Sequence, residues 1–90
     1  MILNSDESDY EADDPATWYT TSDLAHDFRK AGRYDRAASL YYTMAFELYD
    51  MDVYSWLHSA LPHRVMQRYG HEHARHQEQL VRHIAKLLQT

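Results

Sequence analysis

The stretch RYGHEHARH, residues 68–76, is the part of the chain whose residue types could do chemistry. It holds two arginines, one glutamate and three histidines in nine positions. Imidazole and carboxylate groups bind transition metals, and an arginine beside a histidine can stabilise phosphoryl-transfer charge and move a proton. The stretch could therefore be a metal site, a ribonuclease site or the start of a helix. The sequence favours the third interpretation.

A metal site needs more ligands than this stretch supplies. If a helix begins near His71, then His73 and His76 are i, i+3 neighbours that could share one ion, whereas His71 points to the opposite side. Structural zinc takes four protein ligands and catalytic zinc three. The missing ligands would have to come from Glu72, His58 or His63. We therefore expect no metal and no cofactor, with His73 and His76 as the weak candidate pair.

An enzyme is the alternative interpretation of the same residues. Arg68 and His73 form an R-x4-H pattern, and Arg64 and His71 form an R-x6-H pattern. In this respect the chain resembles small all-helical nucleases of the HEPN family, which carry such a motif near a helix junction. The resemblance implies a metal-independent ribonuclease in which Arg68 stabilises phosphorane charge and His73 transfers a proton. Such spacings also arise by chance among seven arginines and a histidine cluster.

Length and composition limit the remaining classes. Ninety residues make one domain with a small core. The chain has no cysteine, which excludes thiolate chemistry and disulfides, and its two glycines are too few for a glycine-rich phosphate loop. The N-terminus lacks the basic and apolar regions of a signal peptide, and no apolar run reaches membrane-spanning length. We expect a cytoplasmic protein without a membrane partner.

Charge is distributed unevenly along the chain. Residues 1–20 contain six acidic and no basic residues, whereas residues 61–90 contain five basic and two acidic residues. Residues 1–17 have few apolar side chains, so we expect an acidic, flexible segment followed by a helical domain over residues 18–90. The net charge of −5 makes nucleic acid a poorer partner than protein.

The periodicity of apolar residues predicts an all-α fold, a small four-helix bundle. Thr20 and Asp23 suit a capping box, and Gly32 suits a helix end. Asp50 and Asp52 can each cap a third helix, and Pro62 interrupts it. No segment alternates with a period of two. The expected helices cover residues 22–31, 34–49, 50–60 and 71–89, with a short helical piece at 63–69. The last helix should turn these side chains inward: Leu80, Val81, Ile84, Leu87 and Leu88.

The first two helices carry a pattern of small and aromatic residues over 24–44. The pattern comprises Leu24, Ala25, Phe28, Gly32, Tyr34, Ala37 and Tyr41. It resembles a tetratricopeptide-repeat hairpin, and it is similar to the microtubule-interacting-and-trafficking domain. It departs from the repeat at Met44, where the family prefers alanine, and no second repeat fits around Pro62. The resemblance implies an N-terminal helical hairpin from a group of peptide- and protein-binding folds.

Aromatic residues exceed what so small a core can hide. Eight tyrosines and two tryptophans stand in ninety residues, and these side chains often anchor interfaces. The sequence therefore predicts an interaction module, an adaptor or an inhibitor that binds a partner protein, with a second copy of the chain as another candidate partner. The expected aromatic contacts are Tyr10, Trp18, Tyr19, Tyr42, Tyr49 and Trp56. The acidic contacts expected to steer a basic partner are Asp9, Glu11 and Asp13.

Overall fold

The structure is a computed structural model that describes residues 20–90, and this part of the chain contains helices and no strand. The predicted all-α class is confirmed there. The helices are α2 (Thr21–Lys30), α3 (Tyr34–Tyr42), the π-helical turn η1 (Thr43–Glu47), α4 (Met51–Ala60), α5 (His63–Tyr69) and α6 (Gln77–Leu88). Residues 20–90 contain five α-helices, so the expected four-helix bundle is not confirmed in detail. The acidic segment 1–17 lies outside the described residues.

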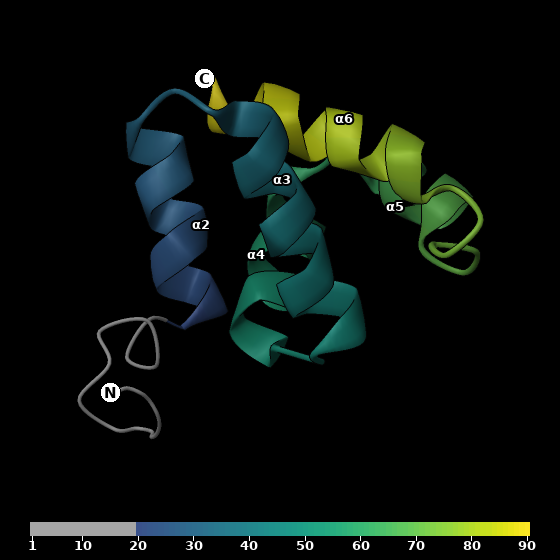
Figure 1. Cartoon of the computed structure of the whole chain (residues 1–90). Coiled ribbons are helices and arrows are strands. Elements are labelled where there is room, and N and C mark those ends of the chain that lie inside the picture. The colour runs from purple at the N-terminus through teal and green to yellow at the C-terminus, as the bar shows by residue number, and fades with distance from the viewer. Residues whose placement is uncertain (1–19) are drawn as a thin grey trace, which may run out of the picture.

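Helices α2 and α3 form an antiparallel hairpin, and α6 packs across α3 on another side (Figure 1). The predicted capping box begins α2: the Asp23 N–H donates to Thr20 Oγ1 at 3.1 Å, and the Thr20 N–H donates to Asp23 Oδ2 at 3.4 Å. Gly32 adopts the left-handed conformation, φ +79°, that lets the chain reverse. Ala25, Ala37 and Ala38 are fully buried, so small side chains let helices approach closely.

The core is apolar and lies between α3, α4, α5 and α6. Its largest fully buried side chains are those of Tyr42, Leu57, Leu80 and Ile84. Leu80, Ile84 and Leu88 place one face of α6 inward, as the periodicity predicts, while Val81 and Leu87 are half-buried. No polar or charged residue is buried among those that the structure describes. Stability therefore rests on apolar burial and packing.

The second helix differs from the continuous helix expected over residues 34–49. The α-helix ends at Tyr42 and widens into η1, where the Leu48 N–H donates to the Thr43 carbonyl at 2.9 Å. Three consecutive residues, Met44, Ala45 and Phe46, are buried. A regular α-helix rotates about 100° per residue, so it would spread three successive side chains over about 200° of its circumference. The wider π-helical turn brings the three closer to one face.

Two helix boundaries after Tyr49 follow from local sequence. Asp50 caps α4, because its Oδ1 accepts hydrogen bonds from the N–H groups of Asp52 and Val53 at 3.1 and 3.3 Å. Pro62 ends α4: Leu61 is extended, ψ 147°, which is the conformation that a following proline requires. The predicted helical piece His63–Tyr69 is confirmed as α5.

The last helix is shorter than predicted. It begins at Gln77, and residues 70–76 form a loop between α5 and α6. Apolar periodicity in this region begins only at Leu80, so no apolar face supports a helix over the histidine-rich residues before it. This correction removes the geometry on which the expected pairing of His73 with His76 depended.

Candidate functional site

His73 is a packing residue of the α5–α6 loop. Its ring stacks on that of Phe46, with 4.7 Å between centroids and 18° between planes. Its Nδ1 lies 3.4 Å from the Gly70 carbonyl oxygen, and its own carbonyl accepts a hydrogen bond from the Tyr42 hydroxyl at 3.1 Å. These contacts attach the loop to α3 and η1.

His76 has different partners from His73. Its ring lies 5.0 Å from the Tyr69 ring, which also lies 5.7 Å from the ring of His83. Its Nε2 is 3.4 Å from Glu72 Oε2, and Arg75 reaches the same carboxylate at 3.8 Å. The loop therefore uses its imidazoles and its glutamate to hold its own shape.

Neither chemical interpretation of RYGHEHARH gains a site from this geometry. Within residues 20–90, no three histidine or acidic side chains are placed to hold a metal ion. The Arg68 guanidinium lies 5.5 Å from the centre of the Tyr69 ring, while His73 packs against Phe46. No hydrogen bond in the described loop joins Arg68 to His73. The two groups of the alternative ribonuclease thus occupy different aromatic environments.

Tyr42 is a core residue and not the surface contact expected from the sequence. Its side chain is 1% exposed and its ring lies 5.1 Å from that of Phe46. Burial raises the pKa of the Tyr42 hydroxyl, and the negative charge of Glu47 raises it further. The protonated hydroxyl is thereby kept as the donor to the His73 carbonyl.

The raised pKa predicts a loss of stability in alkaline solution. The unfolded tyrosine releases its proton near pH 10, whereas the folded one keeps it, so the folded state holds more protons above about pH 10. The free energy of unfolding should therefore be unaffected by this group below that pH and fall as the pH rises above it. Urea unfolding at about pH 8 and about pH 11 checks this. Tyr42→Phe should show a smaller fall, and an equal fall would contradict the assignment to Tyr42.

Of the four exposed large apolar residues among those described, Leu24 lies on α2 and the other three lie at the turn between η1 and α4. Leu48, Tyr49 and Met51, which we call the apolar tip, are 58%, 79% and 69% exposed. Tyr49 has φ +55° and is the non-glycine residue with positive φ in the described chain. The Asp50 N–H donates to the Met44 carbonyl at 2.8 Å, and this hydrogen bond holds the turn against η1.

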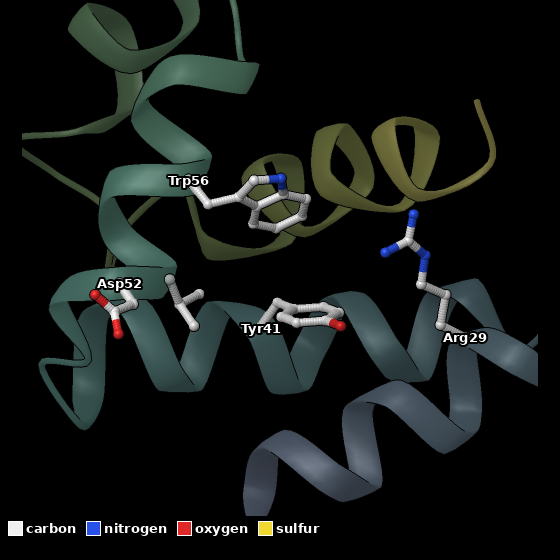
Figure 2. Close-up of a pocket in the computed structure, with 5 residues that line it drawn as sticks. Arg29, Tyr41, Asp52 and Trp56 are labelled. Atoms are coloured by element: carbon white, nitrogen blue, oxygen red, sulfur yellow. The ribbon is translucent and has the colours of Figure 1, made fainter.

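A pocket of about 210 Å³ lies between α3 and α4, and one end of it is lined by Asp52, the residue that follows Met51 (Figure 2). Tyr41 and Trp56 form its centre, with ring centroids 5.4 Å apart at 51°. Arg29 and Asp52 lie at its opposite ends, and Val53 completes the lining. Both aromatic side chains are half-buried, so each is fixed by the helices yet reachable from solvent.

The predicted binding residues divide into three groups. Tyr49 and Trp56 are accessible, Tyr42 is buried, and the remainder lie outside the described residues. Those outside are Asp9, Tyr10, Glu11, Asp13, Trp18 and Tyr19. The sequence prediction named neither Leu48 nor Met51 as a contact residue. An apolar residue on each side of the Tyr49-Asp50 pair was the available signal.

The chain matches no protein-family model, no curated protein and no solved structure in the comparisons made. The resemblances to the tetratricopeptide repeat, the microtubule-interacting domain and the HEPN family therefore stay predictions. Among the described helices, none combines the length and the apolar character that crossing a bilayer requires.

Proposed function

We propose that the chain is a small protein-interaction module, an adaptor or an inhibitor, that binds its partner protein through the apolar tip. The observation that carries the proposal is the exposure of Leu48, Tyr49 and Met51, each more than half accessible within four residues. Burying one large apolar side chain gains about 1.5–3 kcal/mol. A partner that covers the tip would recover this free energy, which the folded monomer does not use.

The backbone of the tip supports the same proposal. A left-handed conformation costs a non-glycine residue about 1–2 kcal/mol, and glycine or asparagine usually occupies such positions. Here the position carries tyrosine, 79% exposed. A strained, exposed aromatic residue does not serve folding, and strain of this kind is concentrated at functional sites. The π-helical turn before it is another feature frequent at such sites.

Charge around the tip favours a basic partner. Glu47, Asp50 and Asp52 lie next to the apolar residues in the sequence, and no ion pair within residues 20–90 uses them. Opposite charge on the partner would speed association more than it would strengthen the complex. The proposal includes the acidic N-terminal contacts, Asp9, Glu11 and Asp13, with Trp18 and Tyr19 beside them. We place the interaction in the cytoplasm because the chain lacks cysteine.

Affinity capture with matched variants tests the function. The double variant Leu48→Ser/Met51→Ser removes apolar area from the tip, and Gln67→Ser/Gln79→Ser changes two exposed residues on α5 and α6. We expect one protein to be retained by the wild type and by the glutamine variant and lost by the tip variant. Calorimetry with that protein, purified, should show affinity lower by at least about tenfold for the tip variant, because central apolar contacts dominate interfaces.

Three outcomes would contradict the proposal. Equal retention by both variants would mean that the tip makes no contact. Degradation of RNA that depends on Arg68 and His73 would favour the ribonuclease. The third outcome is that the captured protein is a second copy of the chain, that the sedimentation of the wild type depends on its concentration, and that this dependence is lost in the tip variant. A second copy would then be the occupant of the tip.

A further inference from the structure

The pocket formed by Tyr41 and Trp56 has charged groups at its ends and apolar groups between them, and this arrangement indicates the chemistry of its occupant. It joins one apolar compartment, formed by Tyr41, Trp56 and Val53, to a guanidinium at one end and a carboxylate at the other (Figure 2). We propose that it receives one aromatic or long aliphatic side chain of the partner protein, flanked by an acidic residue that pairs with Arg29 and a basic residue that pairs with Asp52. This inference rests on the proposed interaction function and specifies the partner segment.

The size of the pocket suits one side chain. The whole pocket, including the part lined by Arg29 and Asp52, has a volume of about 210 Å³. A cavity of about 150 Å³ lined by apolar side chains is enough to hold benzene. One phenylalanine or leucine side chain is therefore of a size that the pocket can receive.

The walls of the compartment come from packed helices. Tyr41 belongs to α3, Val53 and Trp56 belong to α4, and all three pack against the hydrophobic core. The Tyr41 and Trp56 rings also contact each other, with 5.4 Å between centroids. A pocket on regular elements keeps its shape without ligand, which lowers the ordering cost of binding.

The two charged ends are not used by ion pairs within residues 20–90. Arg29 lies in the last turn of α2 and Asp52 in the first turn of α4, where the helix dipoles favour a cation and an anion. Both residues are exposed, and neither takes part in an ion pair in the described part of the chain. The dipoles thus stabilise these charges without occupying their hydrogen-bonding groups.

The charges also reject other occupants. A nucleic-acid strand would bring phosphate to Asp52, where like charges repel. A segment with an acidic residue at each end would be attracted by Arg29 and repelled by Asp52. A segment with a basic residue at each end would be attracted by Asp52 and repelled by Arg29. The mixed segment satisfies both ends, in either chain direction.

Three short synthetic peptides test the proposal on the full chain. Each has a central phenylalanine, flanked by glutamate and lysine, by two glutamates, or by two lysines. Trp18→Phe leaves Trp56 as the one tryptophan of the chain, so its fluorescence reports filling of the pocket. We expect the mixed peptide to bind best to this protein. When Arg29→Glu is added, the two-lysine peptide should bind best, and when Asp52→Lys is added instead, the two-glutamate peptide should bind best. In each case the affinity of the favoured peptide should exceed that of the mixed peptide by roughly two- to fivefold.

A mixed peptide with alanine in place of phenylalanine is the control for the apolar compartment, and it should bind too weakly to change the fluorescence. The same ranking of peptides on all three proteins would overturn the assignment of the charges, and equal binding of the alanine peptide would overturn that of the compartment. If the peptides do not rank as expected, the proposal for the pocket fails, and the capture experiment with the tip variant still tests the proposed function. If the tip variant retains the captured protein while the peptides rank as expected, the proposal for the tip fails and that for the pocket holds.

Discussion

Tyr42→Ala is expected to lower the free energy of unfolding by about 3–5 kcal/mol, the range for removing a buried aromatic side chain. The ring is 1% exposed and lies 5.1 Å from that of Phe46, and its hydroxyl binds the carbonyl of His73. Domains of this size are stable by only about 5–15 kcal/mol. The substitution should therefore remove a fifth or more of the stability. Urea unfolding followed by far-ultraviolet circular dichroism measures the loss.

Two variants separate the contributions of the ring and the hydroxyl. Tyr42→Phe keeps the ring and removes the hydrogen bond, so it should cost about 1 kcal/mol. Tyr49→Ala removes an exposed tyrosine at the turn after η1 and should not destabilise the fold. If Tyr42→Ala were as mild as Tyr49→Ala, Tyr42 would not be a core residue. Its interpretation as an interface residue would then return.

The fate of the α5–α6 loop gives an independent readout. Tyr42 holds the loop through the carbonyl of His73, and His73 stacks on Phe46. Loss of the Tyr42 hydroxyl should loosen residues 70–76 before the rest of the fold. Amide hydrogen exchange in these residues should therefore accelerate in Tyr42→Phe, in which the core remains filled.

Local signals predicted most helix boundaries because they act over a few residues. Thr20 and Asp23 cap each other, Asp50 caps α4 and Pro62 dictates an extended residue before it. The π-helical turn lacked such a signal. It arises because Met44, Ala45 and Phe46 are all drawn inward, and Phe46 meets Tyr54 and His73 from elsewhere in the chain. Those long-range contacts are not visible in the sequence around residue 43.

Neighbouring tyrosines show why the candidate site was only partly predictable. Tyr41 and Tyr42 differ by one position, which on a helix is a rotation of about 100°. The sequence predicted Tyr42 as a surface contact and named Tyr41 only in the hairpin pattern. The structure buries Tyr42, whereas Tyr41 is half-buried against the core and its ring also lines the pocket with Trp56. Both residues lie on apolar stripes, so the choice depended on which helix packs against which face.

Tyr49→Gly is expected to change stability and binding in opposite directions. Glycine adopts φ +55° without the strain that tyrosine bears there, and this gain exceeds the extra entropy that glycine loses on folding. The free energy of unfolding should rise by about 0.5–1 kcal/mol. Affinity for the captured partner should fall by about thirtyfold, the effect of losing a contact worth about 2 kcal/mol. Urea unfolding and calorimetry give the two values.

The opposite signs distinguish a binding residue from a structural one. A tyrosine that served folding would, when replaced, lower stability and affinity together. Tyr49→Phe keeps both the ring and the strain, so it should leave both values close to wild type. Tyr49→Ala should lose affinity without the gain in stability, because alanine bears the same left-handed penalty. A stable Tyr49→Gly that binds as the wild type does would mean that the partner does not contact the ring. The strain at residue 49 would then need another explanation.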